Sequence, residues 1–173
     1  DNDRYYFEGA SEWISGFGGR DWIPMGGDFN GDGKTDACVY NPSTGEFKVV
    51  LSNGASAFSS PTTWLTVAFA ATNWQPFTGN FNGDKYTDLA FYNRDNGEVR
   101  VYLGTGSTFG VYTTWVSDFG NQYTAMSGDF NGDSLSDLCL FKKDSGEFKV
   151  AFSNTVAFVD GASWLSNFAN DKD

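Results

Sequence analysis

Three short acidic stretches recur along the sequence. GDFNGDGKTD occupies residues 27–36, GNFNGDKYTD residues 79–88 and SGDFNGDSLSD residues 127–137. Each places carboxylate or amide side chains at loop positions 1, 3, 5 and 9 and offers a backbone carbonyl at position 7. Oxygen donors at alternate positions of a tight loop suit Ca²⁺, which takes about 6–8 oxygen ligands. The stretches therefore predict calcium binding, with up to three ions.

The predicted ligands occupy the same five positions in each loop, and Lys34, Tyr86 and Leu135 contribute only their carbonyl oxygens. In chain order they are Asp28, Asn30, Asp32, Lys34 and Asp36; Asn80, Asn82, Asp84, Tyr86 and Asp88; and Asp129, Asn131, Asp133, Leu135 and Asp137. The second loop has fewer carboxylates and carries Lys85, so we expect it to bind calcium most weakly. The alternative is a set of Asx turns that hold no metal.

Other metals and other calcium motifs fit less well. The chain has no His and only two Cys, which argues against zinc and copper. An EF-hand loop needs an acidic ligand at position 12 and a helix after it. Position 12 is Val39, Phe91 or Leu140, and an apolar strand pattern follows, so the EF-hand interpretation fails.

The loops belong to a longer repeat of about 50 residues, and tryptophan keeps the same interval at Trp13, Trp64, Trp115 and Trp164. In each copy an apolar run follows the loop, an alternating strand follows a turn, and the Trp lies in a fourth strand. Four antiparallel strands per repeat are typical of a β-propeller blade. The alternatives are a solenoid or a sandwich with accidental similarity.

We therefore predict an all-β chain of about three and a half four-stranded antiparallel propeller-type blades, a partial β-propeller with calcium loops between first and second strands. Propellers close with about 4–8 blades, so either the chain is a piece of a longer one or other copies complete it. The predicted division is a single repeat domain over 1–173, made of a half blade at 1–22 and blades at 23–72, 73–122 and 123–173.

Composition limits the partners and the location. The formal charge of −11 disfavours nucleic acid and anionic membranes as partners. The longest purely apolar run, residues 67–71, is far too short for a membrane span, and residues 1–9 do not read as a secretory signal. Weak calcium loops suit the calcium level outside cells, so we expect an extracellular or cell-surface location.

The two cysteines, Cys38 and Cys139, share one position in two repeats with another repeat between them. Equivalent positions two blades apart lie beyond the reach of a disulfide, which needs Cα atoms within about 7 Å. We predict two free, buried thiols.

The aromatic residues allow two roles. The Trp that recurs in the fourth strand either packs between blades or stacks on sugar rings. Trp22, Trp74 and Tyr123 form a second aligned set, each six residues before the first ligand of a loop. Because these three lie in connections between repeats, we regard them as candidate ligand-binding residues.

Nothing in the sequence indicates catalysis, and we expect no enzyme activity. Without His there is no ordinary acid–base or nucleophile pair, and most acid pairs belong to the loops. A glycosidase pair would have to come from Glu8, Glu12, Glu46, Glu98 and Glu147, of which the last three share one strand position that reads as solvated surface.

The stretch DFNGDGKTD, followed by an apolar strand and repeated at this interval, resembles the FG-GAP/VCBS repeats. Those repeats form the calcium-bearing blades of integrin alpha-subunit propellers and of many bacterial secreted proteins. The "FG" element is present at Phe17-Gly18 and Phe119-Gly120, but Ala replaces the Gly after Phe69 and Phe168. This departure favours the looser microbial type over an integrin-like assignment.

Two functions follow as expectations. The first is a non-enzymatic extracellular calcium-binding module for adhesion or carbohydrate and protein binding, with glycans or surface proteins as partners. The alternative is a structural subunit of a surface or filamentous assembly, formed by head-to-tail packing of incomplete propellers, with other copies of the chain as partners.

Overall fold

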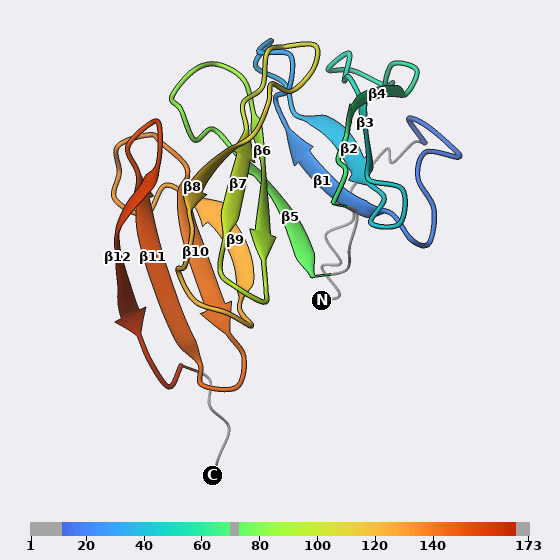
Figure 1. The fold of residues 1–173 in the computed structure, drawn as a ribbon. Coiled ribbons are helices and arrows are strands. Elements are labelled where there is room, and N and C mark those ends of the chain that lie inside the picture. Colours follow the sequence, from blue (N-terminus) through green and yellow to red (C-terminus); the bar gives the residue numbers. More distant parts are fainter. Residues whose placement is uncertain (1–11, 70–72, 169–173) are drawn as a thin grey trace, which may run out of the picture.

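The structure is a computed structural model that describes residues 12–69 and 73–168. These residues form twelve strands in three four-stranded sheets, and each sheet is an antiparallel meander (Figure 1). The strands are β1 (Ile23–Gly27), β2 (Asp36–Tyr40), β3 (Glu46–Val50) and β4 (Thr62–Thr66); β5 (Trp74–Gly79), β6 (Asp88–Asn93), β7 (Val99–Tyr102) and β8 (Thr113–Val116); and β9 (Thr124–Gly128), β10 (Asp137–Lys142), β11 (Glu147–Ser153) and β12 (Phe158–Leu165). The prediction of an all-β chain of four-stranded antiparallel sheets is confirmed.

The described ranges contain no helix, so no helix in them could cross a membrane. The acidic stretches connect the first and second strands of each sheet, where the sequence pattern placed them.

The middle sheet shows why the second strand of each repeat is an unbroken apolar run. Along β6 the side chains of Leu89 and Phe91 pack into a cluster shared with the first sheet. The intervening Ala90 and Tyr92 pack into a cluster shared with the third sheet. Because successive side chains point to opposite faces, a strand between two neighbouring sheets is apolar on both.

The turn between the second and third strands of each sheet depends on a glycine. Gly45, Gly97 and Gly146 have φ of 76°, 74° and 60°, in the left-handed region that glycine tolerates best. A Cβ on Gly45 would also collide with the carbonyl oxygen of Val67, which follows the fourth strand. The recurring Gly-Glu pair is therefore a turn that lets the end of the fourth strand approach the backbone.

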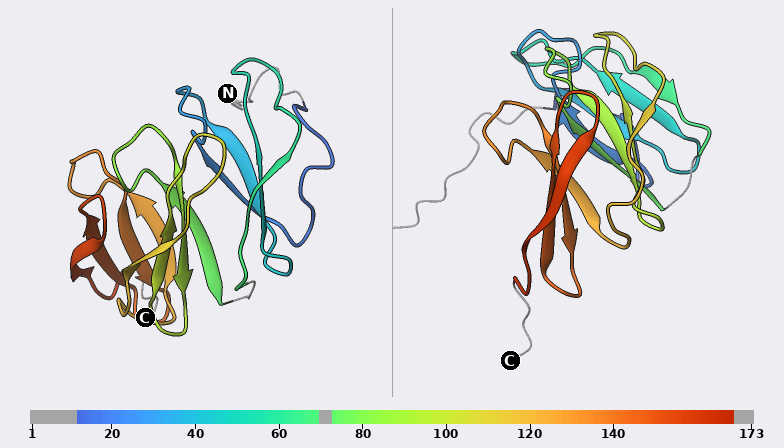
Figure 2. Two further views of the ribbon diagram at one scale, coloured as in Figure 1. Left: turned by 45° about the horizontal axis from the view of Figure 1, so that its top comes forward. Right: turned by 60° about the vertical axis from the view of Figure 1, so that its left-hand side comes forward.

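The three sheets lie side by side as blades, with their first strands adjacent (Figure 2). Gln75 on β5 links two of them, because its amide donates to the Ala125 carbonyl at 2.9 Å and its oxygen accepts from the Ala125 N–H at 3.0 Å. Thr78 on the same strand donates to the carbonyl of Gly26 on β1. Within the described ranges the sheets form an open array and do not close into a ring.

Half of the segment predicted as a half blade at 1–22, residues 1–11, lies outside the described residues. The described part, 12–22, contains no strand. Its Trp13 packs against Phe58 of the first repeat, with ring centres 5.3 Å apart.

Replacement of Phe81 by Ala should lower the free energy of unfolding by about 3–5 kcal/mol, because Phe81 is fully buried among aromatic rings between the second and third sheets. The matched control is Phe130→Ala, at the same repeat position of the third sheet, where the side chain is 37 % exposed. We expect a loss of about 1 kcal/mol there. Urea unfolding of both variants at low protein concentration measures the difference, and equal losses would contradict the inter-sheet packing described above.

Candidate functional site

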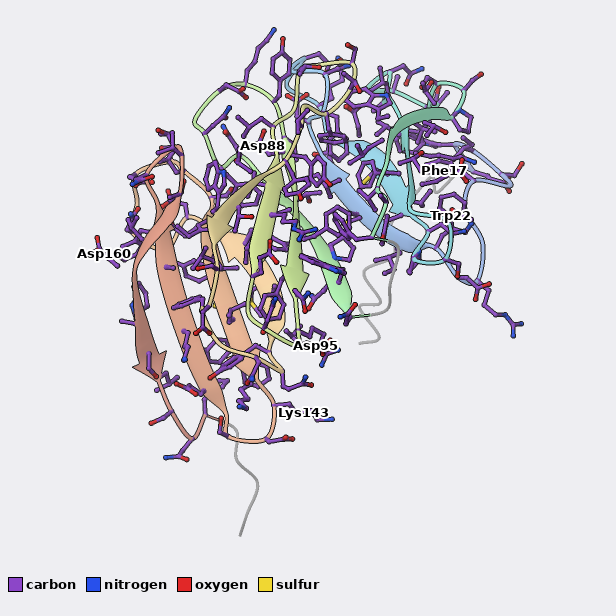
Figure 3. All side chains as sticks on the ribbon, in the orientation of Figure 1. Phe17, Trp22, Asp88, Asp95, Lys143 and Asp160 are labelled. Atoms are coloured by element: carbon purple, nitrogen blue, oxygen red, sulfur yellow. The ribbon has the colours of Figure 1, made fainter. Side chains whose placement is uncertain are left out.

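The acidic loops lie at one end of the sheets and the turns after the second strands lie at the other. Figure 3 shows this for the middle sheet, with Asp88 at the loop end and Asp95 at the turn end. Two separate regions are therefore candidate functional sites: the acidic loops, and the junctions between sheets near the turns.

The first residue of each loop organises the loop backbone. In the first loop, Asp28 accepts hydrogen bonds from the N–H groups of Gly31 (2.7 Å), Asp32 (3.1 Å) and Gly33 (2.7 Å). Asp129 does the same in the third loop with Gly132, Asp133 and Ser134. These N–H groups hold the pKa of Asp129 below its ordinary value, with the N–H of Ser134 contributing most.

The second loop is organised differently because an amide replaces this carboxylate. The side-chain oxygen of Asn80 accepts from Gly83, while its amide nitrogen donates to the carbonyl of Asp84. An amide donor directed at a loop carbonyl holds the backbone in place but removes one anionic oxygen from the loop. This supports the prediction that the second loop is the poorest cation site.

The ninth residue of each loop is a buried aspartate held by two backbone N–H groups. Asp88 accepts from Phe81 at 2.9 Å and from Gly104 at 2.8 Å. The same pair of bonds recurs at Asp36, from Phe29 and Ser52, and at Asp137, from Phe130 and Ser153. One bond reaches back into the loop and the other reaches the end of the third strand, so each aspartate ties the loop to its sheet.

Burial raises the pKa of Asp88 to about 6, and the nearby charge of Asp84 adds to this effect. Burial also raises the pKa of Asp36. No ion pair among the described residues involves either carboxylate. Because the folded pKa lies above that of an unfolded aspartate, the contribution of Asp88 to stability is complete below about pH 4 and is lost as pH rises through about 6.

The donor chemistry of the loops fits a hard divalent cation, since every side-chain donor is a carboxylate or amide oxygen. In this structure many of those oxygens face N–H groups of their own loop, and Asp32 also pairs with the Lys34 ammonium at 2.8 Å. Within the described part of the chain, no three His, Cys, Asp or Glu side chains gather closely enough to form a metal cluster. The loops carry oxygen donors suited to such a cation, and in this structure many of those oxygens accept hydrogen bonds from within their own loop.

The junctions between sheets carry a second repeated arrangement, at the start of each third strand. An acidic and a basic residue alternate there, and the basic side chain extends over the aromatic residue at the start of the first strand of the same sheet. Lys48 lies 5.0 Å from the centre of the Trp22 ring, and Figure 3 shows Trp22 beside the first sheet. The corresponding sets are Glu46, Lys48 and Trp22; Glu98, Arg100 and Trp74; and Glu147, Lys149 and Tyr123.

In the middle repeat this arrangement is closed. The Arg100 guanidinium lies 4.4 Å from the Trp74 ring centre, 4.7 Å from Tyr112 and 4.9 Å from Phe69. Its Nε also donates to Glu98 at 2.8 Å. Three rings and a carboxylate satisfy the guanidinium, so this junction is a packed structural unit.

In the third repeat the same arrangement opens into a cavity of about 510 Å³. Gly161 occupies the position that Tyr112 fills in the middle repeat, and the Phe119 ring lies against it. Lys149 is farther from its aromatic neighbours, at 5.8 Å from the Phe119 ring centre and 5.3 Å from that of Tyr123. The lining residues are Asp118, Phe119, Gly120, Glu147, Lys149, Gly161, Ala162 and Ser163.

Glu147 is the ionised acceptor of this cavity. The Tyr123 hydroxyl donates to its Oε2 at 2.7 Å. That bond, supported by Ser163 and by the charges of Lys149 and Lys142, holds the pKa of Glu147 below its ordinary value. The cavity therefore combines a carboxylate, an ammonium group and an aromatic ring, which suits a polar ligand with a C–H face.

The candidate ligand-binding aromatics lie beneath these junctions. Trp74 and Tyr123 are buried, with their rings covered by basic side chains, and Trp22 is half-buried. The cavity residue Glu147 was interpreted as solvated surface in the sequence, and Lys149 was not singled out. An acidic and a basic residue recur at the same two alternate strand positions in all three repeats, and this pattern is the sequence feature that could have indicated the site.

The recurring fourth-strand Trp packs between sheets where a following sheet is present. Trp64 and Trp115 are buried, whereas Trp164 at the end of the third sheet is 50 % exposed. The cysteine prediction is confirmed, because Cys38 and Cys139 are both free and buried.

Comparison with known families identifies the acidic repeat. Residues 28–91 match the family described as FG-GAP-like repeat, which confirms the resemblance seen in the sequence. No curated protein sequence matches the chain significantly.

Among solved structures, the chain is similar to a lectin of Agrocybe aegerita, described as recognising non-reducing terminal N-acetylglucosamine. The TM-score is 0.66 with 22 % sequence identity, and the match covers 83 % of this chain and 38 % of the lectin chain. At that identity the likeness shows a shared fold alone. The chain spans well under half of the length of that lectin.

Replacement of Asp88 by Asn should destabilise the protein by about 1–3 kcal/mol in chelator, because one buried N–H would face an amide donor where it now has an acceptor. The control is Asp84→Asn, in the same loop but exposed, for which we expect a change within about 0.5 kcal/mol. Urea unfolding at pH 7 with excess chelator checks both values. A neutral Asp88→Asn would show that these two hydrogen bonds do not tie the loop to the sheet.

Proposed function

We propose that this chain, which carries an FG-GAP-like repeat at residues 28–91, is a non-enzymatic carbohydrate-binding module whose blades are stabilised by calcium. The observation that carries the proposal is the open cavity at the third repeat, with an ionised carboxylate, an ammonium group and an aromatic ring on its walls. The lectin-like fold of a structural neighbour supports it.

Each wall of the cavity suits a different part of a sugar. Ionised Glu147 accepts hydrogen bonds from two adjacent hydroxyl groups, and the Lys149 ammonium donates to hydroxyl or acetamido oxygens. The half-buried Phe119 ring offers an apolar surface to the C–H face of a pyranose. A few convergent polar groups beside an apolar wall are characteristic of small-ligand sites.

A difference between the repeats favours the third one as the proposed binding site. In the middle repeat Tyr112 stacks on Arg100, and the guanidinium and Glu98 saturate each other. In the third repeat no direct ion pair joins Lys149 and Glu147, so the ammonium group and the remaining acceptor capacity of the carboxylate, beyond its bond with Tyr123, are available to a ligand. The absence of a side chain at Gly161 lets the Phe119 ring lie against the backbone there, at the wall of the cavity.

Calcium would occupy the three acidic loops through the fifteen residues named above as ligands. A bound cation would offset the repulsion between carboxylates and the cost of burying charged Asp36 and Asp88. The loops lie at the end of the sheets away from the turns, so the metal would stabilise the blades and leave ligand contact to the cavity. Weak sites of this type work at the calcium level outside cells, which is the basis for the proposed extracellular or cell-surface location in adhesion.

Loss of the carboxylate should weaken sugar binding. We expect Glu147→Gln to bind N-acetylglucosamine at least tenfold more weakly, since a hydrogen bond to a charged group contributes about 1.5–3 kcal/mol. Gly161→Tyr should abolish binding by filling the cavity. Glu46→Gln, at the same strand position of the first repeat, is the control and should bind as the wild type does. Titration calorimetry with the monosaccharide, preceded by a glycan array, gives these values. Wild-type affinity in Gly161→Tyr would rule out this cavity.

The calcium loops should titrate unequally. Calorimetry in calcium-depleted buffer should show up to three sites, with the weakest step assigned to the second loop. Asn80→Asp gives that loop the carboxylate set of the others and should strengthen the weakest step about tenfold, or roughly 1.4 kcal/mol. Asn82→Asp adds the same charge at a position that is Asn in all three loops and serves as the control for net charge. An equal gain in both variants would attribute the effect to charge alone.

A further inference from the structure

The segment that leads from the second sheet into the third, residues 119–123, forms one wall of the cavity. Its residues Phe119 and Gly120 both line the cavity. The N–H of Gln122 donates to the carbonyl of Arg94, in the turn after β6, at 2.7 Å. This wall is therefore held by the sheet that precedes it in the chain.

A buried tyrosine of the second sheet holds the same segment at two further points. Tyr92 on β6 is fully buried, and its hydroxyl donates to the Gly120 carbonyl at 2.8 Å. The same hydroxyl accepts from the N–H of Tyr123 at 3.2 Å. Burial raises the pKa of Tyr92, so the hydroxyl stays protonated and able to donate.

A hydrogen bond connects the end of this segment to the carboxylate of the cavity. Tyr123 is buried, and its hydroxyl donates to Oε2 of Glu147 at 2.7 Å. Burial, together with this bond, raises the pKa of Tyr123 to about 12, so Tyr123 also remains a donor. A continuous set of contacts thus runs from Tyr92 through Tyr123 to Glu147, although Tyr92 itself is not among the residues that line the cavity.

The other repeats show that a phenyl ring is enough to build the sheet at this position. Phe141 occupies the position of Tyr92 in the third sheet, and Tyr40 occupies it in the first. The Tyr40 ring is fully buried, but its hydroxyl has no hydrogen-bond partner within the described ranges. Among the described residues, therefore, the hydroxyl at this position finds partners only next to the cavity.

We infer that Tyr92 is a positioning residue, whose hydroxyl sets the orientation of the Glu147 carboxylate by holding Tyr123 in place. Its value for ligand binding rests on the proposed function of the cavity. A carboxylate whose direction is already set loses less conformational freedom when a ligand binds, which strengthens binding without a new contact. The second sheet thereby takes part in a site whose charged groups belong to the third.

Removal of the Tyr92 hydroxyl tests the inference through the ionisation of Glu147. Tyr92→Phe should raise the pKa of Glu147 toward its ordinary value, because Tyr123 would no longer be held against the carboxylate. Tyr123→Phe should raise it directly, and Tyr40→Phe is the matched control that should leave it unchanged. Carbon-13 NMR titration of the side-chain carboxyl groups measures these values, with the Glu147 signal assigned by its loss in Glu147→Gln. The other groups around this carboxylate stay the same in all the tyrosine variants: Ser163, Lys149, Lys142 and Asp118.

A double variant separates positioning from a general loosening of the sheet. If Tyr92 acts through Tyr123, Tyr92→Phe should leave the pKa of Glu147 unchanged once Tyr123→Phe is present. An equal rise with and without the Tyr123 hydroxyl would overturn the inference, and so would a wild-type pKa in Tyr92→Phe alone. Should Tyr92→Phe fail to fold, the wild type provides the test. Its Tyr92 hydroxyl proton should exchange slowly and show a nuclear Overhauser effect to the Tyr123 amide proton, and the absence of that effect would overturn the inference.

Sugar binding provides a separate readout. In titration calorimetry, Tyr92→Phe should bind N-acetylglucosamine roughly threefold to tenfold more weakly, the effect expected from one net hydrogen bond. Tyr40→Phe should bind it as the wild type does. A raised pKa of Glu147 with unchanged sugar affinity would overturn the role of Tyr92 in binding. Wild-type protein that binds no sugar would overturn the proposed function, and the pKa values would still decide whether Tyr92 positions Glu147.

Discussion

Within the described residues the sheets carry apolar side chains on both faces, and such faces are stable only when something packs against them. The middle sheet satisfies this need, with Leu89 and Phe91 packed toward the first sheet and Ala90 and Tyr92 toward the third. Burial of apolar area contributes about 25 cal/mol per Å², and aromatic pairs add to it. Clusters of two Phe rings and one Trp ring, such as Phe81, Trp115 and Phe158, place much of this buried area at the junctions between sheets. In the third sheet the corresponding rings, Phe130 and Trp164, are partly exposed within the described residues.

The buried aspartate at loop position 9 adds a polar constraint to this apolar frame. By accepting one N–H from the loop and one from the end of the third strand, it sets the loop against the sheet in all three repeats. The cost is a charge held away from water, seen in the raised pKa of Asp88. Burial raises the pKa of Asp36 in the same way. In the proposed function a calcium ion at the same loops would offset this cost, which would link fold stability to calcium.

The three sheets share one strand arrangement, but the side chains at the junctions between them differ. The same strand position carries Glu46, Glu98 and Glu147, yet the middle junction is a filled aromatic stack and the third is an open cavity. The two junctions differ at one repeat position: Tyr112 stacks on the basic side chain in the middle repeat, whereas Gly161 in the third repeat is covered by the Phe119 ring. A binding site can thus arise at one junction without disturbing the strand pairing of its neighbours.

The sequence by itself determined the repeat, the all-β class, the four strands of each sheet, the place of the acidic loops and the free state of Cys38 and Cys139. These follow from period-two apolar patterns, turn glycines and the reach of a disulfide, all of which are local or are repeated often enough to read. Only the tertiary structure decided that Trp74 and Tyr123 lie beneath basic side chains, and that Glu147 and Lys149 border a cavity. Those features depend on which side chains of a neighbouring sheet contact a given position. The periodicity of a strand shows which face a side chain lies on, but it does not show that contact partner.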